Sequence, residues 1–316
     1  MYPTNSPKVS VCMLAYNQRE YFRACIESTV SQNTTFPFEI IVCDDASTDG
    51  TAEVLRDYAA RYPDLIRPIY REKNVGHYVN YVEAHNLARG TYVAHMDGDD
   101  LCLPGKLQAQ ADFLDANTEV SVVWHAVQMI DGEGHHVGRA CIRDAIAPDG
   151  YLSIEDALEI GSIGTHSATM YRAAARTTRA PSMKAIDWFY AVEFLSHGKG
   201  YQLAEELGVY RKLVGISMSS NNASVKRVRR NFAAMMNYYI KLFPQYRQQI
   251  FTQSILLVLC DLRAGNSSFI AMLNPLWASR SLISPGRFMR ALRRFRAVSK
   301  AFQPFYSSDL GNVSTS

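Results

Sequence analysis

Short apolar runs alternate with amphipathic helical patterns through the first 130 residues, and this alternation constrains the fold most strongly. Runs such as VSVCMLAY at 9–16 and VSVVWHAVQMI at 120–130 are rich in β-branched residues, which is typical of strands buried on both faces. The pattern predicts strands at 9–16, 39–47, 66–70, 91–96 and 120–130, and helices at 19–32, 51–59, 77–89 and 106–117. Strands that alternate with such helices indicate an α/β fold with a mostly parallel sheet.

The rest of the chain changes character twice. A loop is predicted at 131–150, where Gly, His and Asp are frequent, and a mixed region follows. In that region we expect a helix at 154–160, a strand at 166–172, a helix near 188–197 and a strand near 201–211. Beyond a boundary placed at 214–220 every pattern is helical, at 224–242, 245–263 and 287–302. We therefore predict one α/β domain at 1–215 and a helical region at 216–316.

Composition narrows the class of protein. The chain is 47% hydrophobic and 20% charged, as expected of a globular protein with a sizeable core. Its six cysteines form no CxxC pair and sit in apolar runs, so we expect reduced core thiols in an intracellular protein. The first residues do not resemble a signal peptide, and the apolar run at 255–260 is far shorter than the ~20 residues of a membrane span. A cytoplasmic location is expected.

Acidic residues cluster where two of the predicted strands end. Asp44 and Asp45 end the second run, and Asp97, Asp99 and Asp100 end the fourth. Two carboxylates about 4 Å apart repel by roughly 4 kcal/mol at an effective dielectric of about 20. A divalent cation shared with a phosphate ligand would remove that repulsion, and ligands of α/β sheets bind at this edge. The plain alternative is a solvated turn with helix caps, where Asp is common.

Four segments together resemble a known family. They are VSVCMLAYN at 9–17, IIVCDDASTDGT at 40–51, the Asn74-x-Gly76 turn with its helix and Gly90, and YVAHMDGDD at 92–100. In this order and spacing they are similar to the nucleotide-sugar-binding half of a family 2 glycosyltransferase with the GT-A fold. A weaker likeness continues to about residue 215, so the resemblance implies a donor half at about 1–130 and an acceptor half at about 131–215.

The resemblance implies a site for a nucleotide-diphosphate sugar. Its first strand end and Asp45 would hold the base, Asp97 would lie near the ribose, and Asp99 would ligate Mn²⁺ or Mg²⁺ on the diphosphate. No glycine-rich phosphate cradle is present, which agrees with binding through a metal. The full set of donor-binding residues carried over is Ala15, Tyr16, Asn17, Asp44, Asp45, Asn74, Gly76, Asp97, Gly98 and Arg211.

The family generally inverts the anomeric centre, which requires a carboxylate to take the proton of the acceptor hydroxyl. Asp187 in KAIDWFYAVEF matches the family's acidic position before an aromatic helix, and a plain helix cap is the alternative. Glu193 is the second candidate for the base. His166 and Trp188 are placed on the acceptor side by the same likeness. Many relatives have a His two residues after the Tyr-Arg motif, where this chain has Leu213.

The C-terminal region is strongly basic. Residues 226–300 contain 14 Lys or Arg and one acidic residue, Asp261. Helix 287–302 can place apolar residues on one side and arginines on the others, a pattern typical of helices that lie on anionic membranes. An ordinary helix that packs its apolar side on the domain is the alternative. No nucleic-acid recognition motif accompanies the charge, so nucleic acid is not expected, and a homo-oligomer is left open.

We therefore predict an inverting, metal-dependent glycosyltransferase. It would move a sugar to a hydroxyl of a glycan or lipid-linked oligosaccharide, in bacterial surface polysaccharide synthesis at the inner face of the membrane. A sugar-1-phosphate nucleotidyltransferase is the first alternative, although its Gly-rich, Arg-Lys loop after the first strand is missing here. A non-catalytic nucleotide-sugar-binding subunit is the second. The loops around 131–150 and 160–187 are expected to select the donor and the acceptor.

Overall fold

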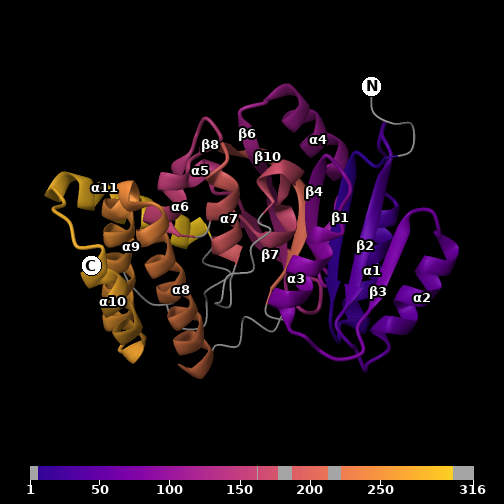
Figure 1. The fold of residues 1–316 in the computed structure, drawn as a ribbon, viewed down its shortest axis with the longest axis horizontal. Helices are drawn as coiled ribbons and strands as arrows, with labels where there is room; N and C mark the ends of the chain where they lie inside the picture. The colour runs from indigo at the N-terminus through magenta and orange to yellow at the C-terminus, as the bar shows by residue number, and fades with distance from the viewer. Residues whose placement is uncertain (1–5, 162, 177–186, 213–221, 302–316) are drawn as a thin grey trace.

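The computed structural model describes residues 6–161, 163–176, 187–212 and 222–301. A central sheet carries helices on both faces, and further helices gather at one end of it (Figure 1). The first elements are β1 (Val9–Ala15), α1 (Arg19–Val30), β2 (Phe38–Asp44), α2 (Thr51–Arg61), β3 (Ile66–Tyr70), α3 (His77–Asn86), β4 (Tyr92–Asp97), β5 (Leu101–Cys102), α4 (Lys106–Ala116) and β6 (Val120–Ile130). These bounds confirm the predicted alternation and add the short β5.

The middle of the chain holds more structure than the sequence pattern predicts. Its elements are β7 (His136–Ala140), α5 (Arg143–Ile146), β8 (Tyr151–Leu152), α6 (Ile154–Ile160), η1 (His166–Ala168), β9 (Met170–Arg172), η2 (Ala173–Ala175), α7 (Asp187–Leu195) and β10 (Lys199–Arg211). The predicted loop at 131–150 is wrong, since β7 pairs with β6 there and α5 follows. The predicted strand at 166–172 begins as a 3₁₀ turn.

The sheet is parallel on one side and mixed on the other. Its order is β3-β2-β1-β4-β9-β6-β10-β5, with β7 beside β6 and β8 beside β10. The strands β3, β2, β1 and β4 are all parallel, as are β6 and β10. The short strand β9 runs antiparallel to both β4 and β6 and joins the two parts. The predicted α/β sheet is thus confirmed, and its antiparallel strands lie beyond β4.

Alternation along the inner strands divides the core into two layers. In β1, Val9, Val11 and Met13 pack in the layer of α1, α2 and α4, while Cys12 and Leu14 pack in the opposite layer. Successive side chains of a strand point to opposite faces, so an uninterrupted apolar run is needed where both faces are covered. The cysteines follow the prediction in five of six cases, because only Cys260 is exposed.

The C-terminal helices extend one of these layers. They are α8 (Asn222–Leu242), η4 (Pro244–Tyr246), α9 (Arg247–Arg263), η5 (Ser267–Met272), α10 (Leu273–Ala278) and α11 (Pro285–Ala301). Met235, Tyr239 and Leu257 belong to the same apolar cluster as Trp188 and Leu158. The helical region therefore shares its core with the α/β part. The predicted boundary at 214–220 and Leu213 lie outside the described residues.

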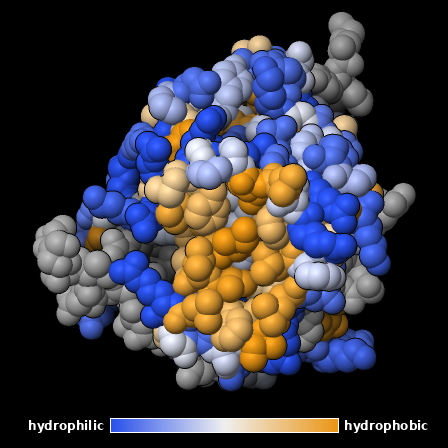
Figure 2. All heavy atoms as spheres, turned by 90° about the vertical axis from the view of Figure 1, so that its left-hand side faces the viewer, coloured by the Kyte–Doolittle hydropathy of each residue, from blue (hydrophilic) through white to orange (hydrophobic). Residues whose placement is uncertain are grey.

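The end of the molecule formed by these helices has an exposed apolar surface (Figure 2). Leu259 and Leu262 on α9, Ile270 on η5 and Leu273 on α10 are each about half exposed, and we call these four residues the apolar patch. Trp277, one turn beyond Leu273, is 71% exposed. Among the described helices, none is both long enough and apolar enough to cross a bilayer.

Candidate active site

Three loops meet where β1, β2 and β4 end. Ala15 pairs with Asp44 across β1 and β2, and Leu14 pairs with Asp97 across β1 and β4. Because these strands are parallel, their carboxyl ends share one edge of the sheet. The structure therefore brings the two predicted acidic clusters together with the loop that follows Ala15.

The loops after β1 and β2 are tied to each other by side chains. The Asn17 amide donates to Ser47 Oγ at 2.9 Å, and the Thr48 amide donates to Asn17 Oδ1 at 2.8 Å. Asn17 and Ala46 both have positive φ, of 50° and 61°. Asn tolerates this region and Ala rarely adopts it, so the contacts must hold the turn in place. Tyr16 is half-buried.

Asp44 and Asp45 are buried, and their carboxylates accept hydrogen bonds from backbone amides. Both oxygens of Asp45 accept hydrogen bonds from the turn before α3, one from the Val75 amide at 2.8 Å and one from the Gly76 amide at 2.9 Å. Gly76 has a φ of 87°, which favours glycine. Asp44 Oδ2 accepts from the Ser47 amide at 3.1 Å, and its Oδ1 is buried without a protein partner. Asn74 is exposed at the start of the same turn.

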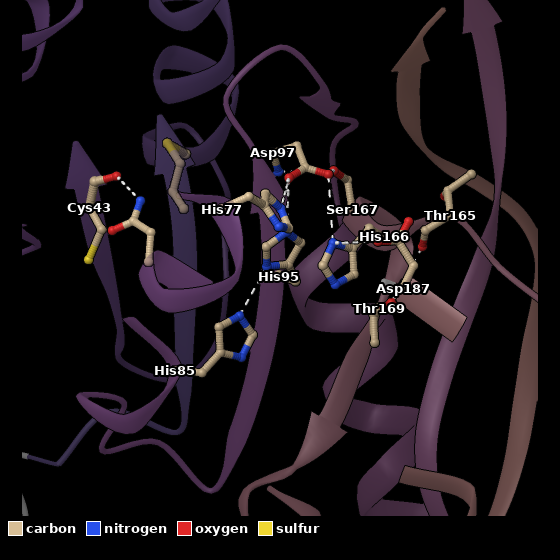
Figure 3. A network of polar contacts seen from close by, with 12 residues as sticks. Cys43, His77, His85, His95, Asp97, Thr165, His166, Ser167, Thr169 and Asp187 are labelled. Atoms are coloured by element: carbon tan, nitrogen blue, oxygen red, sulfur yellow. Dashed lines mark hydrogen bonds and ion pairs between the residues drawn. The ribbon is translucent and has the colours of Figure 1, made fainter. Parts of the chain in front are cut away.

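The Asp97 carboxylate is surrounded by three imidazoles (Figure 3). Its Oδ1 is 3.1 Å from His95 Nε2 and 3.8 Å from His77 Nε2, and its Oδ2 is 3.9 Å from His166 Nδ1. Burial alone would raise the pKa of Asp97, but the charge of His95 and hydrogen bonds from His77 and His95 hold this pKa well below its usual value. The carboxyl is therefore ionised at neutral pH.

A buried chain of hydrogen bonds stands behind Asp97. Tyr171 Oη lies 2.7 Å from His85 Nδ1, and His85 Nε2 lies 3.0 Å from His95 Nδ1. An ionised Asp97 can only accept, so His95 Nε2 donates to it. Burial and the neighbouring imidazoles lower the pKa of His85 well below its usual value, which keeps that ring neutral.

Asp99 and Asp100 are buried, and their pKa values are raised. Burial and the charge of Asp97 raise the pKa of Asp99 to about 6. Burial and the charges of Asp99 and Asp97 raise the pKa of Asp100. One oxygen of Asp100 accepts from the Arg211 amide at 2.8 Å, and the other is buried without a protein partner. The turn holds carboxylates whose negative charge is not fully compensated by the described residues.

Gly98 and Arg211 shape this turn. A Cβ on Gly98 would lie 2.6 Å from Gln18 Oε1 and 2.8 Å from the Leu14 carbonyl oxygen, so no side chain fits there. Arg211 donates from Nε to the Asp99 carbonyl oxygen and from Nη1 to the Asp131 carbonyl oxygen, each at 3.2 Å. It also stacks over Tyr21 at 4.4 Å. Arg211 thus braces the acidic turn in this structure.

Asp187 begins α7 beside this cluster. Its carboxylate is about half exposed and approaches His166 Nδ1 to 3.6 Å. Burial and the charge of His95 lower the pKa of His166 to about 4, so the ring is neutral at neutral pH. Both residues line a small cavity together with Trp124, Thr165 and Tyr190. The structure therefore joins Asp187 and His166 to the acidic strand edge.

Trp188 and Glu193, which the sequence placed at the acceptor side and as the second candidate base, lie outside this cluster. Trp188 is buried in the core, stacks on Phe232 and donates from Nε1 to the Ala157 carbonyl oxygen at 2.8 Å. Its expected contact with an acceptor is therefore withdrawn, because no face of the indole reaches the surface. Glu193 accepts from Tyr239 Oη at 3.0 Å and faces the C-terminal helices.

The sequence pattern missed the imidazoles. His77 and His85 come from α3 and His95 from β4, and although all three lie in segments that carried the resemblance, none was singled out. One signal was available, because His95 precedes Asp97 by two residues and the two must share a face of β4. His77 and His166 are far from Asp97 in sequence, so only the fold brings them together.

The acidic edge fits a divalent cation. Asp99 and Asp100 are buried carboxylates with raised pKa values, and one Asp100 oxygen has no protein partner. Carboxylate oxygens are the preferred ligands of Mg²⁺ and suit Mn²⁺ as well. A cation at this edge would offset the mutual repulsion that the sequence already indicates.

Comparison with solved structures defines the fold. The crystal structure of Staphylococcus aureus TarS 1–349 superposes with a TM-score of 0.61 at 18% identity, over 94% of this chain and 89% of that one. A mannosyltransferase from Pyrobaculum calidifontis, solved in complex with GDP-Man and Mn²⁺, superposes with a TM-score of 0.56 at 16% identity, over 97% and 89% of the two chains. The protein has the GT-A fold of these glycosyltransferases.

Sequence comparison defines the family. The family model described as glycosyl transferase family 2 matches residues 10–177, and the chain belongs to this family. An uncharacterised protein of Mycobacterium bovis is 35% identical over 209 residues, which cover 65% of this chain and 58% of that protein. This chain thus spans less than two thirds of that relative. The putative glycosyltransferase EpsE of Bacillus subtilis is 35% identical over 214 residues, or 64% of this chain and 72% of EpsE.

Proposed function

We propose that the protein transfers a sugar, with inversion, from a nucleotide-diphosphate donor to a hydroxyl of a glycan or lipid-linked acceptor. The observation that carries the proposal is the acidic turn at Asp97–Asp100, which lies beside the half-exposed Asp187. Membership in glycosyl transferase family 2 supports this reaction class. Residues 1–130 would hold the donor and residues 131–215 the acceptor.

The donor would enter at the ends of β1, β2 and β4. Ala15, Tyr16 and Asn17 on one side and Asp44 and Asp45 on the other frame the position of the nucleotide base. The turn at Asn74 and Gly76 closes this frame, because Asp45 binds its amides. Structures of TarS with UDP-GlcNAc and with UDP support a nucleotide-sugar donor for this fold.

Asp99 would hold Mn²⁺ or Mg²⁺, with Gly98 and Arg211 shaping the turn around it. Bound there, the ion would act as a Lewis acid that stabilises the negative charge of the leaving diphosphate. The protein itself contributes a fixed turn, since Arg211 holds the carbonyl oxygens of Asp99 and Asp131. A mannosyltransferase of this fold was solved with GDP-Man and Mn²⁺, which supports the choice of ion.

Asp187 would act as the general base. Its carboxylate is open to solvent, so an acceptor hydroxyl can reach it and give up its proton as the sugar bond forms. His166, which the resemblance places on the acceptor side, lies 3.6 Å away. The turn after β4 approaches from the donor side, which would place the two substrates on opposite sides of Asp187.

The acceptor would be a bacterial surface polysaccharide or its lipid-linked precursor. Relatives support this class by name, since the putative teichuronic acid biosynthesis glycosyltransferase TuaG of Bacillus subtilis is 31% identical over 218 residues. Those residues cover 68% of this chain and 82% of TuaG. A cytoplasmic location at the inner face of the membrane would place the protein beside lipid-linked acceptors.

A panel of nucleotide sugars tests the reaction. We expect one donor to be hydrolysed slowly in the presence of Mn²⁺ or Mg²⁺, with release of the nucleoside diphosphate and faster turnover when an acceptor glycan is added. Formation of a nucleotide sugar from a nucleoside triphosphate and a sugar-1-phosphate would instead establish the nucleotidyltransferase. Donor binding without turnover, for every acceptor, would favour the non-catalytic subunit.

The C-terminal region would contact an anionic membrane through the apolar patch rather than through α11. The apolar side of α11 is already used, since Ala291 and Val298 are buried and Arg294 pairs with Glu159 at 3.2 Å. The apolar patch is exposed to solvent (Figure 2). Next to it, the Arg280 guanidinium carbon lies 4.6 Å from the centre of the Trp277 ring. Exposed leucines with Trp and Arg at their margin are typical of interfacial helices.

Vesicle sedimentation tests this contact. We expect the full chain to sediment with vesicles that contain anionic lipid, and Leu262→Glu with Ile270→Glu to lower the bound fraction several-fold. Val137→Glu is the matched control, because Val137 is 41% exposed on β7, outside the apolar patch. Equal sedimentation of the patch variant and the wild type would exclude the patch as the membrane contact.

A further inference from the structure

A second group of potential metal ligands lies next to the acidic turn. Within the described ranges, His77, Asp97 and His166 are the one set of three or more such residues whose ligand atoms all lie within 4.8 Å of one another. The three come from the start of α3, the end of β4 and the turn η1 (Figure 3). Asp99 is not part of this set, although only Gly98 separates it from Asp97.

The measured separations are close to those of a coordination shell. His77 Nε2 lies 3.8 Å from Asp97 Oδ1, and His166 Nδ1 lies 3.9 Å from Asp97 Oδ2. Ligand atoms at about 2.0–2.2 Å from a shared ion in tetrahedral geometry are separated by about 3.4 Å. The ligand atoms of all three residues lie within 4.8 Å of one another, so they must draw closer around an ion, and the half-exposed His77 side chain can move to do so.

The surroundings hold two of the three ligands in place. His95 binds Asp97 Oδ1 at 3.1 Å and is itself bound by His85, which forms the supporting layer that metal-binding carboxylates commonly have. The His166 ring packs against His95, at 3.8 Å between ring centres, and stacks on Tyr81, at 5.1 Å. The low pKa of His166 leaves its imidazole neutral and able to coordinate.

We propose that His77, Asp97 and His166 form a binding site for a first-row transition-metal ion, separate from the cation assigned to Asp99. Two imidazoles and one carboxylate with open positions suit zinc, manganese, iron or cobalt, whereas Mg²⁺ prefers an all-oxygen shell. Asp187 Oδ1 lies 3.6 Å from the same nitrogen of His166, so its charge adds to the attraction. The site binds its ion without a donor sugar.

Cobalt provides a direct probe, because Co²⁺ absorbs visible light when imidazoles coordinate it. The full chain, stripped with a chelator and free of nucleotide sugar, is titrated with Co²⁺, and bound metal is counted by mass spectrometry. We expect one tightly bound Co²⁺ that Zn²⁺ displaces and a large excess of Mg²⁺ does not. His77→Ala should weaken binding at least about tenfold, and its half-exposed position allows the fold to survive.

Two variants separate this site from the rest of the account. His197→Ala removes an exposed imidazole away from the cluster and should leave Co²⁺ binding unchanged. Asp99→Asn should also leave it unchanged, even if it abolishes sugar transfer. Failure to bind Co²⁺, or binding that survives His77→Ala and is lost in Asp99→Asn, would overturn the three-residue site and leave the proposed transferase intact. If the chain binds Co²⁺ as expected but turns over no donor, the proposed function is contradicted and the three-residue metal site is not.

Discussion

At the scale of single residues, Asp187 and His166 form the contact on which the chemistry of transfer would depend. Their 3.6 Å approach joins the start of α7 to the cluster around Asp97. Neither residue is adjacent to the acidic turn in sequence. The Asp187 carboxylate is half exposed, whereas His166 is buried, so of the two Asp187 would meet an incoming hydroxyl.

We predict that Asp187→Asn lowers kcat at least about a hundredfold, the low end of what a general base contributes. The dissociation constant of the donor should stay within about twofold, because Asp187 lies on the acceptor side. Steady-state kinetics and calorimetric donor binding measure the two effects. Glu193→Gln is the matched control, since Glu193 faces Tyr239 and not the site. Unchanged kcat in Asp187→Asn would remove it as the base.

Glu39 gives a residue-scale prediction about stability. It is buried and accepts hydrogen bonds from Ser10 Oγ at 2.6 Å and from the Arg89 guanidinium at 2.6 and 3.0 Å. Burial alone would raise the pKa of Glu39, but these partners lower it. A carboxylate with a lowered folded pKa stabilises the protein above its unfolded pKa, about 4.3, and the effect is lost as pH falls through the folded pKa.

Glu39→Gln should therefore lower the free energy of unfolding by roughly 1.5–3 kcal/mol at neutral pH, and by less near about pH 3. Urea denaturation at the two pH values measures the difference. Glu53→Gln serves as the control, because the Glu53–Arg56 pair is exposed and contributes little. A Glu39→Gln effect that does not depend on pH would contradict the role of its charge.

The sequence predicts which residues form the acidic edge, but it does not predict which residues they contact. The carboxylates at Asp45, Asp97 and Asp99 were predictable because they directly follow apolar runs, and parallel strands place such ends at one edge. Their partners were not. The binding of Asp45 to the turn at Gly76 and of Asp97 to three imidazoles depends on tertiary contacts. Trp188 was misplaced because an aromatic next to a candidate base can face either the site or the core.

At the scale of elements, the turn between β4 and α4 would carry the proposed donor site. Its residues Gly98–Asp100 are buried, and they touch both the loop after β1 and the end of β10. The long strands and helices up to residue 130 were predicted to within a few residues, since their apolar periodicity is uninterrupted. β7 was missed because its side chains are mostly exposed and show no apolar alternation.

Gly98→Ala should disturb this turn. Its new Cβ would meet the Leu14 carbonyl oxygen at 2.8 Å, and backbone cannot move aside as a flexible side chain can. We expect a loss of roughly 1–3 kcal/mol in the free energy of unfolding, typical of overpacking, together with weaker donor binding. Thermal unfolding and donor titration measure both. Gly286→Ala is the control, because a Cβ there meets nothing within 4 Å. Equal stability of the two variants would show that the turn tolerates a side chain.

At the scale of the whole molecule, the acidic and basic parts of the chain are joined by contacts. Arg294 on α11 pairs with Asp156 and with Glu159 on α6, and Arg229 pairs with Asp261. The sequence showed the charge asymmetry but not these pairs. Arg294 lies 138 positions from Asp156 and 135 from Glu159 along the chain. The C-terminal helices also continue the apolar layer of α6 and α7.

Removal of residues 285–316 should therefore destabilise the entire molecule. It would expose the surface that α11 covers on α5, α6 and α9 and leave Glu159 without Arg294. We expect the melting temperature to fall by more than about 5 °C, with a single transition for the whole chain. Calorimetry measures the shift.

A pair of substitutions on α11 controls for the deletion. Val298 is buried and Met289 is 46% exposed, so Val298→Asp should lower the melting temperature while Met289→Asp should not. Two separate transitions in the wild type, or an unshifted melting temperature after deletion, would contradict a shared core.

The central claim is that the acidic turn binds the donor through a divalent cation. Calorimetry with the donor identified from the panel tests it most directly, in Mn²⁺ and again in chelator, for the wild type and for Asp99→Asn. The account predicts that the wild type binds the donor at least about tenfold more tightly in Mn²⁺ than in chelator, and that Asp99→Asn loses this difference. Equal donor affinity with and without Mn²⁺, or an Asp99→Asn variant that keeps the full metal effect, would contradict it.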